Sequence, residues 1–196
     1  MTDRRSEIVA AALEVFAERG YRGGSLAAVG ERVGLTQQGV LHYFPSKDAL
    51  LTEVLRLRDA LDGQDPAGSG PDHAGPDHAG SAGLAGVESL VARNMGRPGL
   101  VQCFTVLAAE SVTDQHPAHD FFAARYRALR PQLAALLRAE LGDPGPSGLT
   151  ADQASALLIA VMDGLQQQWL LDPGEVDMAA LISAFAGVLR RAPGPG

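Results

Sequence analysis

The sequence predicts an all-α protein in which a three-helix N-terminal head with a helix-turn-helix precedes a C-terminal helical bundle. Three observations predict this class. Apolar residues recur at helical spacing along most of the 196 residues, as expected of amphipathic helices. Aromatic residues make up only 5% of the chain, and no stretch alternates apolar and polar residues as a half-buried strand would. Serine and threonine repeatedly stand just before a helical stretch, which is the capping position.

The first helix is expected from about Ser6, a candidate N-cap, to Gly20. Glycine suits that end because it readily takes the left-handed conformation in which many helices terminate. Ser25 then caps a second, short helix, and Gly34 ends it for the same reason.

Thr36 caps a third helix, which runs to Phe44. Pro45 stops this helix because the residue before a proline is pushed out of helical geometry. Ser46 can cap the fourth helix, whose apolar positions extend to Leu61.

Residues 62–83 change the character of the chain, because they contain no large apolar side chain and repeat Gly-Pro-Asp-His-Ala twice. Such a segment cannot bury enough surface to offset the entropy of ordering, so we expect a flexible linker. His73 and His78 within it would be weak metal ligands, and a low-complexity repeat is the simpler interpretation. The tail at 192–196 is expected to be disordered.

Helices resume beyond the linker. The expected ranges are 84–94, 100–112, 118–141 with a proline-induced bend at Pro131, a helix capped by Thr150 and ending at Leu171, and 176–190. The predicted domains are therefore a head at 1–50 and a ligand-binding and dimerisation domain at 51–196.

The net charge of −7 at first argues against a nucleic-acid partner. Residues 1–61, however, hold eight basic and eight acidic residues, so all the excess acid lies in the remainder of the chain. A neutral head can still present a local basic face to phosphates while the acidic body is held away.

The feature that carries function is the pair of short helices around the turn Gly34-Leu35. Such a pair places its second helix in the major groove of DNA. Glutamine on that helix can bind adenine bidentately, and a lysine at the start of the next helix suits a phosphate. The predicted DNA-binding residues are Ser25, Thr36, Gln37, Gln38, His42, Tyr43 and Lys47.

The run from Ser25 to Leu50 resembles the DNA-binding signature of the TetR family, and Phe16-Ala-Glu-Arg-Gly-Tyr before it is also typical. The resemblance implies that Tyr43 and Lys47 touch phosphates and that Thr36 to Gln38 begin the base-reading surface. Two positions depart from the family pattern. Leu41 replaces an aromatic that contacts the backbone, and Gln38 replaces a frequent glycine.

The second half of the chain resembles a TetR-type C-terminal domain common in actinobacterial regulators, through runs such as Asp163-Gly-Leu-Gln-Gln-Gln-Trp. This implies a homodimer whose last two long helices form the interface, and middle helices that enclose a small-molecule effector. The expected interface comprises Leu157, Leu158, Val161, Leu165, Leu181, Phe185 and Val188. The expected pocket comprises Cys103, Phe104, Leu107, Phe122, Tyr126, Met162, Gln166 and Trp169.

The predicted function is therefore a dimeric repressor that a small molecule releases from a palindromic double-stranded DNA operator. The alternative is a helical small-molecule-binding protein or an enzyme that uses His116, His119 and Asp120. No nucleophile–base pair or metal motif of recognised spacing accompanies them, so we expect no enzyme, catalytic residue, cofactor or metal. The chain has no signal peptide, no membrane-spanning apolar run and a single cysteine, which indicates a cytoplasmic protein.

Overall fold

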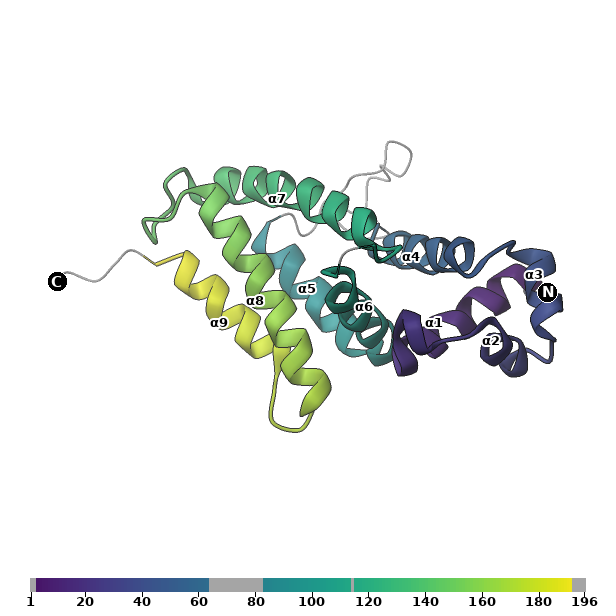
Figure 1. Ribbon diagram of the computed structural model, residues 1–196. Helices are drawn as coiled ribbons and strands as arrows, with labels where there is room; N and C mark the ends of the chain where they lie inside the picture. Colours follow the sequence, from purple (N-terminus) through teal and green to yellow (C-terminus); the bar gives the residue numbers. More distant parts are fainter. Residues whose placement is uncertain (1–2, 64–82, 114, 192–196) are drawn as a thin grey trace. The chain divides into compact units, whose positions relative to one another are not determined.

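The computed structural model describes residues 3–63, 83–113 and 115–191. These residues form nine α-helices and no strand (Figure 1), which confirms the all-α prediction. The helices are α1 Arg4–Gly23, α2 Leu26–Arg32, α3 Gln37–Tyr43, α4 Lys47–Gly63, α5 Leu84–Met95, α6 Pro98–Ser111, α7 His119–Leu141, α8 Ala151–Leu171 and α9 Met178–Leu189. The predicted flexible linker at 62–83, His73 and His78 included, falls almost wholly outside the described residues, as does the tail at 192–196. None of the described helices is both long and apolar enough to cross a bilayer.

The predicted caps of four helices are confirmed. The hydroxyls of Ser25, Thr36 and Ser46 accept backbone N–H bonds at 3.1, 3.1 and 3.0 Å at the starts of α2, α3 and α4. Thr150 and Gln153 form a reciprocal capping box at the start of α8. Each of these caps satisfies N–H groups that have no partner within the helix.

Two helix starts were predicted wrongly. α1 is capped by Asp3, whose carboxylate accepts from the Arg5 N–H, so Ser6 lies inside the helix. α9 is capped by Asp177 rather than beginning at Val176. In both cases an aspartate near the expected start provides the stronger, charged acceptor.

The chain divides into two compact units. Unit 1 comprises Met1–Asp62 and Arg97–Phe122. In it α1 packs along α6 and against α2, and α2 packs against α3 (Figure 1). Phe16, Val40 and Phe44 are among its buried side chains. Packing therefore joins α6 to the N-terminal helices. The predicted boundary at residue 50 divides the chain by expected function rather than by packing, and it stays a prediction.

Unit 2 comprises Gly63–Gly96 and Ala123–Gly196. Within it α9 packs against both α5 and α8 (Figure 1). Its core includes Leu84, Leu158, Ile182 and Leu189.

Candidate nucleic-acid interface

The turn between α2 and α3 is held by close backbone contacts. The Leu35 N–H donates to the Gly30 carbonyl at 2.8 Å, and Gly34 adopts φ +67°. A Cβ at Gly30 would lie 2.6 Å from the Leu35 carbonyl oxygen. Because that oxygen is backbone and cannot rotate away, glycine at position 30 permits this tight helix-turn-helix geometry.

One side of α3 is anchored and the opposite side is free. Val40 and the following Phe44 are buried, with 0% and 1% exposure. Gln37, Gln38 and His42 are exposed. Gln38 and His42 are each two positions from Val40 and therefore lie on roughly the opposite face of α3. Gln37 is exposed at the first residue of the helix.

Four of the predicted DNA-binding residues make contacts within the head. The hydroxyls of Ser25 and Thr36 cap α2 and α3. The half-buried Tyr43 ring meets the His42 ring edge-on, at 5.4 Å between centroids. Leu41, which departs from the family pattern, is half-buried.

Two arginines at the start of α1 hold the C-terminal ends of the helix pair. Arg4 Nη2 donates to the Val33 carbonyl at 2.6 Å, and Arg5 Nη1 donates to the Tyr43 carbonyl at 2.7 Å. The Arg5 guanidinium also lies 4.4 Å from the centre of the Phe44 ring. Cations at the ends of α2 and α3 satisfy free carbonyls and favour the helix dipoles. The sequence interpretation missed both arginines.

Lys47 begins α4 and rests on an aromatic ring. Its Nζ lies 4.3 Å from the centre of the Tyr21 ring, a cation–π distance. Burial lowers the pKa of Lys47, while the negative charges of Glu110 and Asp48 act in the opposite direction. The Tyr21 hydroxyl donates to Asp48, and burial, followed by that hydrogen bond, raises the Tyr21 pKa. The first two residues of α4 are thus both held by Tyr21.

The residues of the predicted ligand pocket are divided between the two units. Cys103, Phe104, Leu107 and Phe122 are buried in unit 1. Tyr126, Met162, Gln166 and Trp169 belong to unit 2. Only Met162 and Gln166 line the hollow found there. Helical spacing indicates which face of a helix is apolar, but it does not indicate which other helix packs against that face.

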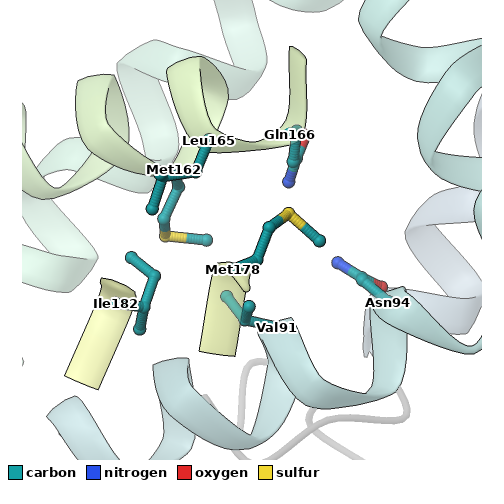
Figure 2. A pocket seen from close by; sticks show the side chains of 7 residues that line it. All are labelled: Val91, Asn94, Met162, Leu165, Gln166, Met178 and Ile182. Atoms are coloured by element: carbon teal, nitrogen blue, oxygen red, sulfur yellow. The ribbon is translucent and has the colours of Figure 1, made fainter. Parts of the chain in front are cut away.

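That hollow lies among α5, α8 and α9, and its side chains leave no enclosed space large enough for a water molecule. Figure 2 shows the thioethers of Met162 and Met178 extending into it, with the amides of Asn94 and Gln166 beside Met178. Asn94 is only 3% exposed. The seven lining residues carry no charge: Val91, Asn94, Met162, Leu165, Gln166, Met178 and Ile182.

The expected dimer residues fall into two groups. Leu157, Leu181 and Val188 are exposed by 46, 45 and 55%, and Val161 and Phe185 are half-buried. Leu158 and Leu165 are instead buried in unit 2, with 1% and 9% exposure. One helical position corresponds to a rotation of about 100°, which separates Leu157 from its buried neighbour.

In the cluster named for the alternative function, His116 and His119 make contacts with neighbouring residues. The His116 side chain is 1% exposed, its Nδ1 accepts from the Ala118 N–H, and its Nε2 lies 3.6 Å from Glu110 Oε2. Burial lowers the His116 pKa. His119 Nδ1 lies 2.9 Å from the Ser111 carbonyl oxygen, and Asp120 is exposed. No group of three potential metal ligands occurs within the described ranges.

Comparison with protein families agrees with this geometry. A family described as bacterial regulatory proteins, tetR family, matches residues 8–54. The C-terminal family of BetI-type transcriptional repressors matches residues 82–192. The HTH-type transcriptional regulator RutR of Escherichia coli K12 is 40% identical over 53 residues, which cover 27% of this chain and 25% of that protein. The chain thus spans about a quarter of the length of the curated relatives it matches.

Solved structures with the same fold extend over almost the whole chain. A transcriptional regulator from Rhodococcus sp. Rha1 has a TM-score of 0.75 at 20% identity, covering 97% of this chain and 100% of that one. A regulator from Saccharomonospora viridis in complex with choline has a TM-score of 0.71 at 19% identity, covering 93% of each chain. FadR from Bacillus subtilis in complex with stearoyl-CoA has a TM-score of 0.66 at 14% identity, covering 94% and 96%.

Proposed function

The chain belongs to the TetR family of bacterial transcriptional regulators, with a BetI-type C-terminal region, and from this premise we propose that it is a ligand-responsive repressor acting as a homodimer. Each head inserts α3 into the major groove of a near-palindromic operator. The two heads then lie about one helical turn of DNA apart, roughly 34–36 Å. The observation that carries the proposal is α3 itself, anchored by Val40 while Gln37, Gln38 and His42 face outward. The proposal places the protein in the cytoplasm and assigns it no catalytic role.

Base recognition is assigned to Gln37 and Gln38. Each bidentate pair to a base contributes about 1–3 kcal/mol of discrimination. Replacing both by alanine is expected to abolish the preference for operator over unrelated DNA while weak, salt-sensitive binding persists. Fluorescence anisotropy measures both affinities, and Gln167→Ala on the exposed surface of α8 is the matched control. Unchanged discrimination in the double variant would overturn the assignment.

Phosphate contact is assigned to Tyr43 and Lys47. A lysine that neutralises one phosphate per head predicts that Lys47→Ala lowers the salt slope of binding by about two per dimer. Leu41 supplies no phosphate contact of its own, because leucine has no hydrogen-bonding group. Leu41→Tyr is therefore expected to increase affinity without changing sequence preference, and a loss of affinity would contradict this interpretation.

Dimerisation is assigned to the outward apolar face of α8 and α9, which carries Leu157, Val161, Leu181, Phe185 and Val188. Several large apolar side chains left exposed on one helix pair are typical of an interface. Leu181→Glu with Val188→Glu is expected to yield monomers in analytical ultracentrifugation. Val112→Glu is the control, because Val112 is also exposed, by 78%, but lies at the end of α6. A dimeric double variant would refute this interface.

Effector binding is assigned to the hollow among α5, α8 and α9. Its support is the buried amide of Asn94, which lies beside the flexible thioethers of Met162 and Met178 (Figure 2). Methionine side chains move easily and can make room for a guest. Two proteins of this fold were crystallised with choline and with stearoyl-CoA, which are ligands of very different chemistry. The uncharged lining favours a small neutral compound with a hydrogen-bonding group.

A thermal-shift screen of neutral amides, lactones and ketones, followed by an assay of operator release, tests this site. Compounds that release the operator are expected to lose their effect on Asn94→Leu, whereas Gln167→Ala responds like the wild type. Compounds that act equally on both variants would exclude the hollow as their site.

A further inference from the structure

Glu110 on α6 reaches the kink near the end of α1. Its Oε2 accepts a hydrogen bond from the Tyr21 backbone N–H at 2.6 Å. Gly20, just before Tyr21, has φ +66°, and a Cβ there would overlap the Glu110 carboxylate. Glycine at this position therefore provides both the backbone conformation and the space that the carboxylate occupies. Gln102, two turns earlier on α6, supports the same pairing of helices by donating to the Ala17 carbonyl at 3.2 Å.

Tyr21 connects this contact to the start of α4. Its ring lies under the Lys47 ammonium at 4.3 Å, and its hydroxyl donates to Asp48. The rings of Phe16 and His116 flank the Tyr21 ring, with centroids 5.9 and 5.2 Å away. Tyr21 is thus held at its backbone N–H, by two neighbouring rings and at its hydroxyl, so it has little freedom to move. The Lys47 ammonium, which rests on the Tyr21 ring, is positioned by it.

The Glu110 charge also acts on Lys47 directly. It is among the negative charges that favour the cationic form of this half-buried lysine against the effect of burial. The side chain of Glu110 is 28% exposed, so its field is only partly screened by water.

We propose that Glu110 is a positioning residue for DNA binding: it fixes Tyr21 and, through Tyr21, holds the Lys47 ammonium where it meets a DNA phosphate. The helix α6, outside the helix-turn-helix, would thereby set the phosphate contact of the head. This inference rests on the proposed phosphate contact of Lys47, and it assigns no contact with DNA to Glu110 or Tyr21.

A double-mutant cycle tests the proposal on the full-length protein. The probe is a fluorescein-labelled duplex selected from a randomised pool by the wild-type protein, titrated at several salt concentrations. Glu110→Ala is expected to weaken binding roughly ten-fold and to lower the salt slope as Lys47→Ala does. The variant carrying both substitutions is expected to bind no more weakly than Lys47→Ala alone, because the two residues act through one contact.

Two further variants separate positioning from folding. Glu110→Gln keeps an oxygen that accepts from the Tyr21 N–H, so it is expected to recover most of the affinity. Tyr21→Leu keeps that backbone hydrogen bond but removes the ring under Lys47, so it is expected to lower the salt slope even if Glu110→Ala fails to fold. Glu140→Ala in unit 2 is the matched control, with unchanged DNA affinity expected.

The outcomes distinguish the phosphate contact of Lys47 from the positioning role of Glu110. If Lys47→Ala lowers the salt slope while Glu110→Ala and Tyr21→Leu bind like the wild type, the phosphate contact stands and the positioning role is wrong. Additive effects of Glu110→Ala and Lys47→Ala would also refute the positioning role. If Lys47→Ala has no effect, the phosphate contact fails and the inference fails with it.

Discussion

Glu110 in unit 1 and Glu140 in unit 2 form the same local arrangement in two different settings. Each carboxylate accepts a backbone N–H just after a glycine of positive φ, Glu110 from Tyr21 at 2.6 Å and Glu140 from Leu84 at 2.8 Å. A Cβ on either glycine would overlap the carboxylate. The two glutamate side chains are also equally accessible, with 28% and 29% exposure.

The two glutamates differ in their cationic partners. Glu140 is paired with Arg190 at 3.0 Å, and Glu88 lies 3.8 Å from the same guanidinium. Glu110 faces the buried His116, whose lowered pKa favours the neutral ring, and it acts at longer range on Lys47. If Lys47 contacts DNA as proposed, the same local geometry serves stability alone at Glu140, where the charge is paired with Arg190, and also influences DNA binding at Glu110.

The largest expected effects come from the two glycines. Gly20→Ala and Gly83→Ala each force a side chain into the left-handed region and displace the carboxylate, which costs about 2–4 kcal/mol of unfolding free energy. Urea denaturation measures this loss. Only Gly20→Ala should also weaken operator binding in conditions where both variants are folded. Equal loss of DNA affinity in the two variants would remove the functional distinction between the units.

Removing Glu140 is expected to cost about 1.5–3 kcal/mol, because the charge-assisted bond to the Leu84 N–H at the start of α5 is lost. The contribution of Arg190, which also lies near Glu88, to the unfolding free energy should depend on whether Glu140 is present. In a double-mutant cycle, Arg190→Met is expected to destabilise the wild type more than it destabilises Glu140→Ala. Strict additivity of the two unfolding free energies would mean that Arg190 does not complete the arrangement.

A pH effect should distinguish the units, because His116 adjoins Glu110 whereas Arg190 adjoins Glu140. The folded-state pKa of His116 is lowered by burial, so the unfolded chain binds the additional proton more readily below about pH 6.5. Stability from the neutral ring is therefore complete above that pH and is lost as the pH falls, at up to about 1.4 kcal/mol per pH unit. His116→Asn, which keeps an acceptor for the Ala118 N–H, should flatten the urea-denaturation profile between about pH 7 and 5. If stability fell with pH as steeply in His116→Asn as in the wild type, groups other than His116 would cause the acid sensitivity.

The smallest effect is expected from Tyr21→Phe. This change removes the hydroxyl that donates to Asp48 but keeps the ring beneath Lys47, so about 0.5–1.5 kcal/mol of stability is lost. The salt slope of DNA binding should remain that of the wild type, in contrast to Tyr21→Leu. A lowered slope in Tyr21→Phe would show that the hydroxyl, rather than the ring, determines the position of Lys47.

The features that the sequence predicted correctly are those formed between residues close together in the chain. Ser25 and Thr36 cap helices through N–H groups three residues away, and such signals are visible in any short window. Glu110 meets Tyr21 across 89 positions, and Arg5 meets Tyr43 across 38. Periodicity cannot reveal these partners, because it gives the face of one helix and not the helix that covers it.

The same limit applies to the expected interface and pocket. Leu157 and Leu158 are equally apolar, yet only the first is exposed. The boundary between an outward and an inward stripe on α8 depends on where α9 packs. Cys103 and Trp169 both occupy apolar helical positions, but they belong to different units, and only three-dimensional packing separates them.

The packing of α6 along α1 limits how this protein can be recombined with its relatives. A head excised at residue 50 and grafted onto a foreign body would retain Tyr21 and Lys47 but lose the carboxylate and the helix that support them. Exchange of operator specificity should therefore succeed more often when residues 97–122 are transplanted together with the first sixty-two. The compact unit that contains the helix-turn-helix is thus made of two separate segments of the chain.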